Sequence, residues 1–292
     1  MSSPGDGSGE DLLPAFCGLL PHPPIVVPAV GGARTQGCRP TLEACRELAR
    51  RLVERRPGRL LMVSPHSPRR AGAFGLWRGE LLRGHLGRFG APDAEVRLAN
   101  DRQLAAAVER AAAASGAATW GIPPEPLDHG ATVPLWFLAE AGWQGPTTVV
   151  SSPWHASVGE LEGFGRAVAR AAAELGESRG ALALVASGDM SHRCSPTAPA
   201  GFHPRAVEHD LELTARVRRG DLRSIGTLDP ELREMAAEDT VEASVIVAAA
   251  IDYRAEGHEV LSYEHPFGVG YLVAVFHSGS PRPGRAPIDG LS

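Results

Sequence analysis

The sequence contains no lysine, little cysteine and no long apolar run. All 29 basic residues are arginine, which we interpret as the mark of a GC-rich genome, and 34 acidic residues leave a net charge of -5. This net negative charge argues against binding of the phosphate backbone as the main function. The longest apolar run, residues 245–251, is far shorter than the roughly 20 residues of a membrane-spanning helix. We therefore expect neither nucleic acid nor a membrane as a partner.

The few cysteines also exclude two classes of small domain. Cys17, Cys38, Cys45 and Cys194 show no C-x-x-C spacing, so neither a disulfide scaffold nor a structural zinc knuckle is expected. We expect all four to be reduced, with Cys17 and Cys45 in the core. The first ten residues are acidic and rich in serine and glycine, without the features of a signal peptide, which predicts a soluble, cytoplasmic protein.

The remaining composition is that of an ordinary globular protein, with 43% hydrophobic and 22% charged residues. Short apolar runs alternate with longer helical patterns, which is typical of an α/β fold. Strands are expected at residues 16–20, 60–64, 147–151, 181–186, 258–262 and 271–276. Helices are expected at residues 41–54, 101–114, 133–141, 157–175, 204–218 and 230–253, the last with a break near Thr240. We predict one domain, residues 14–277, between disordered tails at 1–13 and 278–292.

The histidines carry the functional signal. Three expected strands run directly into a segment that holds a histidine, namely His22, His66 and His192, and His129 lies in a turn before a helix. The carboxyl ends of strands form the ligand crevice of an open α/β sheet, so these residues can converge although they are far apart in the sequence. One such histidine is more often a turn residue, but four in equivalent settings favour a site. His155, after the strand at 147–151, is expected beside the ligands or in the substrate pocket.

This pattern suits a metal. Two neutral imidazoles and one carboxylate on one face of an ion leave positions open for substrate and oxygen, as in non-haem Fe(II) oxygenases. Two histidines would then remain for proton transfer. We expect the carboxylate from the acidic cluster Glu238, Asp239 and Glu242, although a charged first helical turn is the common explanation for any one of them. The same ligand set also suits catalytic zinc, so a zinc hydrolase stays an alternative.

Six segments give the sequence a family resemblance. Together they resemble the class III extradiol dioxygenase (LigB-like) superfamily, and most closely its Memo/AMMECR1-associated branch. They span most of the chain in the family's order: LLPHPPIVVPAVGG (19–32), VSPHSP (63–68), LDHGATVPLWFL (127–138), SGDMSHR (187–193), AAED (236–239) and SYEHPFGVGY (262–271).

The resemblance implies a three-layer α/β/α sandwich with a largely mixed central sheet. It implies that His22 and His66 bind the metal, that His129 and His192 are active-site histidines not bound to it, and that Fe(II) is the cofactor, with zinc or copper as alternatives. Relatives in this branch typically have the sequence Ala-Ala-Glu-Cys-Gly where this chain has Ala-Ala-Glu-Asp-Thr (236–240). Asp239 therefore stands at the cysteine position and Thr240 at the glycine position. In Memo-type proteins that cysteine binds the metal, so Asp239 would complete a two-His-one-carboxylate set. Asp239 is our first choice, Glu238 the second and Glu242 the third.

The function implied is a dioxygenase that opens the ring of a catechol or 2-aminophenol-like aromatic substrate with O2. His192 would serve as the base that takes the substrate proton and later returns it, and His129 would hydrogen-bond oxygen or the developing anion. Asp189 and Asp128 would orient these rings, or simply form turns. The alternative is a Memo-like metal-binding, redox or partner-binding protein without ring-cleavage activity.

The surroundings of the site are predicted more loosely. The loop at residues 193–204 has the length of a lid, and four side chains are expected to line the pocket: Arg193, Trp154, Phe202 and Tyr271. The resemblance leaves open both a homo-oligomer and a small accessory subunit.

Overall fold

The fold is described by a computed structural model that covers residues 14–176 and 180–279. The predicted tail at 1–13 lies outside the described residues, and so does the predicted tail at 278–292 apart from Ser278 and Gly279. Ser278 is the last residue of the final strand and pairs with Phe16.

An eight-stranded mixed sheet forms the centre of the molecule, in the order β6-β3-β7-β2-β8-β1-β10-β9. Its strands are β1 (Phe16–Leu20), β2 (Arg59–Val63), β3 (Ala73–Trp77), β6 (Ala118–Ile122), β7 (Thr147–Ser151), β8 (Leu182–Ser187), β9 (Glu259–Glu264) and β10 (Tyr271–Ser278). The four central strands β7, β2, β8 and β1 are parallel, whereas β10 runs antiparallel to β1 and β3 runs antiparallel to β7. Every residue of those central strands is buried, as expected for parallel strands covered on both faces.

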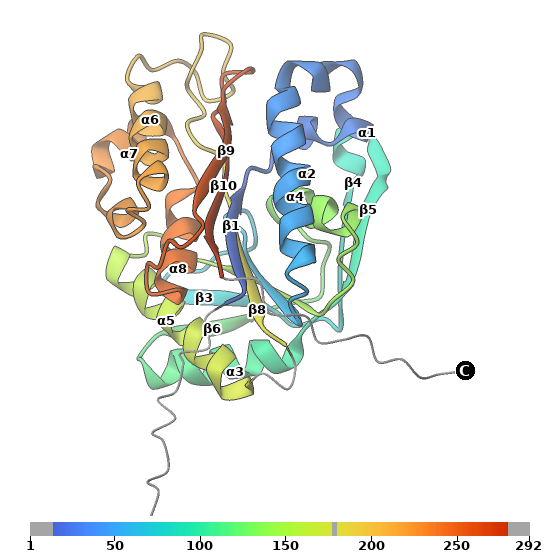
Figure 1. Cartoon of the computed structure of the whole chain (residues 1–292), viewed down its shortest axis with the longest axis vertical. Coiled ribbons are helices and arrows are strands. Elements are labelled where there is room, and N and C mark those ends of the chain that lie inside the picture. The colour runs from blue at the N-terminus through green and yellow to red at the C-terminus, as the bar shows by residue number, and fades with distance from the viewer. Residues whose placement is uncertain (1–13, 177–179, 280–292) are drawn as a thin grey trace, which may run out of the picture.

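Helices cover both faces of this sheet, which confirms the predicted α/β/α sandwich (Figure 1). On one face lie α2 (Arg39–Glu54) and α4 (His129–Glu140). On the other lie α3 (Arg102–Ala114), α5 (Val158–Leu175) and α8 (Val241–Ala250), with α6 (Ala206–Arg218) and α7 (Pro230–Ala236) beside them. Shorter turns complete the chain: η1 (Pro24–Val26), α1 (Pro28–Gly31), η2 (Gly32–Cys38), η3 (Gly87–Phe89) and η5 (Arg223–Thr227).

The break predicted near Thr240 is present, and it shapes the site. Helix α7 ends at Ala236, Ala237 adopts a left-handed conformation with φ of 53°, and α8 begins at Val241. The acidic pair Glu238 and Asp239 therefore lies in a tight turn between two helices rather than within one.

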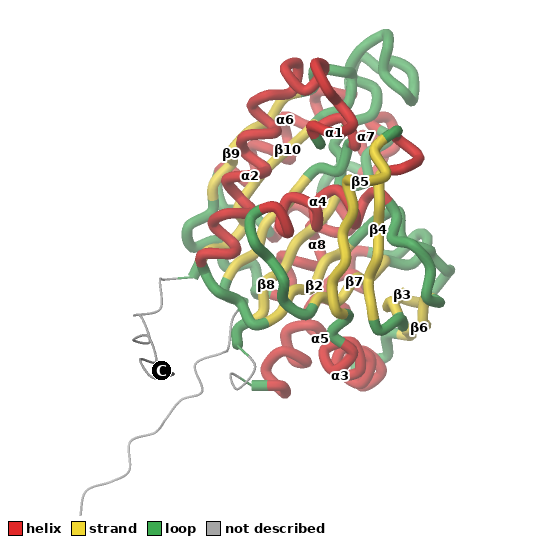
Figure 2. Tube along the Cα trace, turned by 90° about the vertical axis from the view of Figure 1, so that its right-hand side faces the viewer, coloured by secondary structure: helices red, strands yellow, loops and turns green. Residues whose placement is uncertain are grey.

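Residues 73–99 and 118–122 contain strands that the sequence pattern did not predict. β3 and β6 are short, and each contains a glycine. β4 (Leu81–Leu86) and β5 (Ala91–Ala99) form a separate two-stranded sheet, which packs against α4 instead of joining the main sheet (Figure 2). Helix α4 begins at His129, four residues before the predicted start, because Asp128 accepts a hydrogen bond from Ala131 N–H and caps it.

Two expectations about composition can be compared with the structure. All four cysteines are free and buried, with Cys17 and Cys45 in the core as predicted. Among the helices that the structure describes, none is both long and apolar enough to cross a membrane.

Candidate metal centre

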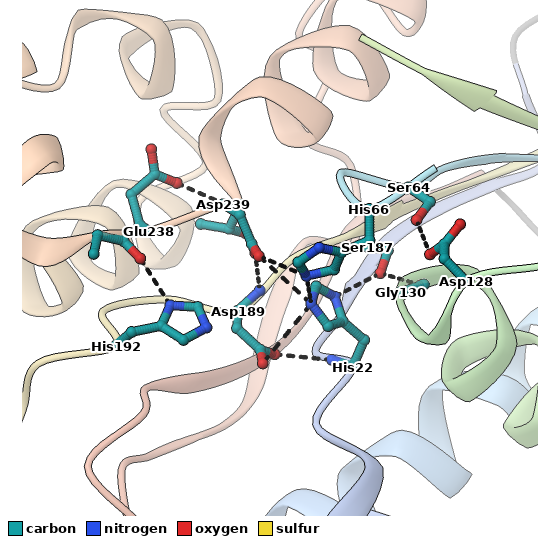
Figure 3. A network of polar contacts seen from close by, with 12 residues as sticks. His22, Ser64, His66, Asp128, Gly130, Ser187, Asp189, His192, Glu238 and Asp239 are labelled. Atoms are coloured by element: carbon teal, nitrogen blue, oxygen red, sulfur yellow. Dashed lines mark hydrogen bonds and ion pairs between the residues drawn. The ribbon is translucent and has the colours of Figure 1, made fainter. Parts of the chain in front are cut away.

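Two histidines and an aspartate lie together where three neighbouring strands of the sheet end. β1, β8 and β2 are adjacent and parallel, and the chain passes from their carboxyl ends to His22, Asp189 and His66. The Nε2 atoms of His22 and His66 lie 3.0 Å apart. Histidines separated by 44 positions thus point their ring nitrogens at one another, as the strand-end pattern predicts (Figure 3).

Asp239 completes a triangle with this pair. Its Oδ2 lies 3.2 Å from His66 Nε2 and 3.5 Å from His22 Nε2. The turn is fixed to the end of β8, since Asp189 N–H donates to Asp239 Oδ1 at 2.7 Å and Asp239 N–H donates to the Asp189 carbonyl at 3.2 Å. Gly188 permits this approach, because a Cβ there would collide with the backbone of Thr240.

His129 joins the cluster from the first residue of α4. Its ring stacks on that of His66, with centroids 4.4 Å apart and an interplanar angle of 26°. His22, His66 and His129 each offer one nitrogen within 4.8 Å of the others, so these three imidazoles could hold a metal ion. Asp239 and His129 are thus alternative third partners of the His22–His66 pair.

The ring of His22 is oriented by a chain of contacts that begins at a proline. Pro134 lies inside α4 and has no N–H to donate to the carbonyl of Gly130 four residues earlier. Ser187 Oγ–H donates to that carbonyl instead, at 2.5 Å. The Ser187 oxygen is then left to accept from His22 Nδ1–H, at 2.9 Å. In the neutral ring this leaves the lone pair on Nε2, the atom that faces His66 and Asp239.

The charges of the cluster favour a cation at this point. Burial opposes the charged form of His22, but the carboxylates of Asp189 and Asp239 outweigh it and raise the pKa of His22 to about 9. Burial likewise opposes the charge of Asp239, yet His22 and His66 hold its pKa well below the usual range. Burial, together with the charges of His22 and His66, lowers the pKa of His129 to about 4. Asp239 is therefore ionised and His129 neutral at neutral pH.

The two other acidic candidates face away from the histidines. Glu238 accepts from the N–H groups of Thr240 and Val241 at 2.7 and 2.8 Å, and it pairs with Arg233 at 2.7 Å. It therefore caps α8. Glu242 accepts from Ser152 and Arg69, each at 2.5 Å. Among the three acidic residues, Asp239 is the one within ion-pair distance of His22 and His66.

His192 lies at the other end of the network, with Asp189 and Asp239 between it and His66 in Figure 3. Its Nδ1–H donates to the Ala237 carbonyl at 2.8 Å, and its backbone N–H donates to the Ala236 carbonyl at 2.9 Å. A carbonyl can only accept, so Nδ1 carries the proton and Nε2 of the neutral ring is free to take another. Ala237 holds this carbonyl in place from its left-handed conformation, which costs about 1 kcal/mol for a residue other than glycine.

The structure gives different partners to Asp189 and Asp128, the two residues predicted to orient the histidine rings. Asp189 Oδ1 accepts from the backbone N–H of His22 at 2.9 Å. Asp128 caps α4 and accepts from Ser64 and Ser67, at 2.7 and 2.6 Å, rather than from an imidazole. His155 is exposed in a left-handed turn after β7 and makes no hydrogen bond or ion pair to the cluster within the described part of the chain.

The four side chains predicted to line the pocket lie in different environments. Trp154 and Phe202 are exposed, whereas Tyr271 is buried in the core, and Arg193 donates to the Met235 carbonyl at 3.3 Å. Sequence reasoning missed Phe89, whose ring centroid lies 5.6 Å from that of His129. Its only signal in the sequence is an aromatic residue between two short alternating segments.

The donor set fits a divalent metal ion. Ligands about 2.1 Å from one ion, at angles between 90° and the tetrahedral value, lie about 3.0 to 3.4 Å from each other. The three separations among His22 Nε2, His66 Nε2 and Asp239 Oδ2 are 3.0, 3.2 and 3.5 Å. Two imidazoles and one carboxylate on a single face match the ligands of non-haem iron sites and also those of catalytic zinc.

Comparison with known proteins identifies the class to which this fold and this site belong. Residues 16–274 match the family described as the catalytic LigB subunit of aromatic ring-opening dioxygenases, and the chain belongs to that family. The family is the one expected from the six segments, but the Memo/AMMECR1-associated branch stays a prediction.

Two known proteins are similar to this chain. Protein CA_C1420 of Clostridium acetobutylicum is 29% identical over 264 residues, which cover 87% of this chain and 56% of that protein, so the chain spans little more than half of its relative's length. The crystal structure of the uncharacterized protein JW3007 from Escherichia coli K12 superposes with a TM-score of 0.57 at 17% identity, covering 89% of this chain and 98% of that one. The second likeness concerns the fold alone.

Proposed function

We propose that the protein is a non-haem Fe(II)-dependent dioxygenase of the extradiol type, which opens the ring of a catechol or 2-aminophenol-like substrate with O2. One observation carries the proposal: two imidazole nitrogens and a carboxylate oxygen lie 3.0 to 3.5 Å apart in a member of the LigB family. Three ligands on one face of an ion would leave its other positions open for a substrate with two adjacent heteroatoms.

In this proposal His22, His66 and Asp239 hold the metal. Fe(II), when bound, supplies Lewis acidity and open coordination positions for substrate and O2. His192 offers an unprotonated Nε2, because its Nδ1–H is engaged by the Ala237 carbonyl, and takes the proton of the substrate hydroxyl. His129, kept neutral by burial and by its cationic neighbours, hydrogen-bonds the developing anion.

A direct assay tests the proposal. The protein is loaded with Fe(II) under anaerobic conditions, mixed with a panel of catechols and 2-aminophenols, and exposed to O2. We expect O2 uptake in step with a coloured ring-opened product, and loss of both in Asp239→Ala. Metal uptake without O2 consumption on the whole panel would contradict the proposal and favour the metal-binding or redox alternative. Metal analysis of protein purified without added metal separates iron from zinc and copper.

A further inference from the structure

An exposed aromatic side chain lies against the histidine cluster. Phe89 is 42% exposed, and its ring is tilted by 56° to that of His129 with centroids 5.6 Å apart. It belongs to η3, the turn that connects β4 with β5. Neither strand contributes a residue to the metal cluster, so the hairpin brings a purely apolar group to a charged site.

The hairpin holds Phe89 in a fixed position relative to His129. Alternate residues of β4 and β5 are buried, and Leu82 pairs with Leu98 on that face. Gly84 lies directly on α4, since a Cβ there would collide with the Thr132 side chain. Gly90 closes the turn in a left-handed conformation with φ of 86°. The hairpin is therefore packed on the helix whose first residue is His129.

The chemistry of Phe89 and of the adjacent histidine cluster suggests which kind of ligand binds here. A phenyl ring that stays partly exposed beside the half-buried ring of His129 offers an apolar surface, while the cluster offers positions for two polar heteroatoms. A planar aromatic ring that chelates through one edge presents its other carbons to such a surface. We propose that Phe89 is a substrate-contact residue that packs on the ring of the chelating ligand and selects aromatic over aliphatic chelators. This inference rests on the proposed function and adds a specificity determinant to it.

The test compares an aromatic with an aliphatic chelator. Fe(II)-loaded protein is titrated anaerobically with 4-nitrocatechol, followed by its absorbance, and with glycolate in competition. Phe89→Ala is expected to weaken nitrocatechol binding by about 3- to 10-fold, the range of one aromatic contact, with glycolate and metal affinity unchanged. Phe89→Tyr is expected to restore nitrocatechol binding. The matched control is Leu81→Ala, at a 40% exposed position of the same hairpin, which is expected to bind both chelators normally.

Three outcomes would overturn the inference, and they are distinguishable. Equal nitrocatechol affinity in Phe89→Ala and the parent protein would show that Phe89 does not contact the ligand, and it would leave the proposed function unaffected. Equal losses for nitrocatechol and glycolate would indicate general damage to the site instead of an aromatic contact. A parent protein that binds Fe(II) but no nitrocatechol would contradict both the inference and the proposed function.

Discussion

Removing the hydroxyl of Ser187 should weaken metal binding even though Ser187 is not a ligand. The hydroxyl donates to the Gly130 carbonyl and accepts from His22 Nδ1–H. In Ser187→Ala both groups lose their partner, and the ring of His22 is free to turn or to place its proton on Nε2. Loss of a group that orients a metal-bound histidine typically reduces metal affinity by about 10- to 100-fold.

The same change should lower the free energy of unfolding. Two buried polar groups lose their hydrogen bonds, and each such loss costs about 1 to 3 kcal/mol, so we expect a decrease of about 2 to 6 kcal/mol. A second variant, Ser187→Ala with Pro134→Ala, separates the two effects. Replacing the proline restores a backbone N–H that can donate to the Gly130 carbonyl, so part of the stability should return. His22 Nδ1–H stays without its acceptor, so metal affinity should stay low.

The assays are uptake of Zn²⁺ and Fe²⁺ in competition with a chromophoric chelator, and urea unfolding of the metal-free proteins. Ser244→Ala is the matched control, because Ser244 is equally buried and its hydroxyl has no hydrogen-bond partner among the described residues. Parental metal affinity in Ser187→Ala would refute the reasoning. Recovery of metal affinity in the double variant would also refute it, because the loss would then come from helix α4 and not from the ring of His22.

Four further predictions concern the ligands and their protons. Asp239→Ala should lose metal binding by equilibrium dialysis, whereas Glu238→Gln should keep it and lose stability through the Arg233 pair and the α8 cap. Because the pKa of His22 is raised from 6.5 to about 9, metal must displace a proton below pH 9, and the measured affinity should fall about tenfold per pH unit from 9 to 7. The stability of the metal-free protein should show the opposite trend. The contribution of His22 to the free energy of unfolding should be fully present below pH 6.5 and should be lost as the pH rises through 9. His192→Ala should keep iron but lose ring opening by about 10²- to 10⁴-fold; a parental rate would exclude its role as the base.

The sheet core and the histidine pair could be predicted because their signals are local. Runs such as 16–20 and 60–63 are apolar throughout and so must be buried on both faces, and the histidines follow them directly. Parallel strands then bring those positions to one edge. The carboxylate that forms the third ligand could not be selected in the same way. Glu238 and Asp239 are adjacent in a turn, and what separates them is their partners in the folded chain: Glu238 accepts from Thr240 and Val241, whereas Asp239 accepts from Asp189 and faces His22.

The hairpin that carries Phe89 was missed for a different reason. β4 and β5 lie outside the main sheet and pack against α4, and their short alternation of buried and exposed residues is a weaker signal than the continuous apolar runs of the central strands. His155 shows the opposite error. It follows a buried strand as His66 does, but it lies in a left-handed turn and, among the described residues, makes no hydrogen bond or ion pair to the cluster. Position after a strand thus indicates an edge of the sheet, whereas the turn decides the direction of the side chain.

A crystal structure of the Fe(II)- or Zn²⁺-loaded protein would decide the ligand set. We predict one ion bound by His22 Nε2, His66 Nε2 and an Asp239 carboxylate oxygen, each at about 2.0 to 2.2 Å, with His129 and His192 unbound. An ion held by His22, His66 and His129 with Asp239 outside its reach, or an ion bound elsewhere, would contradict this prediction.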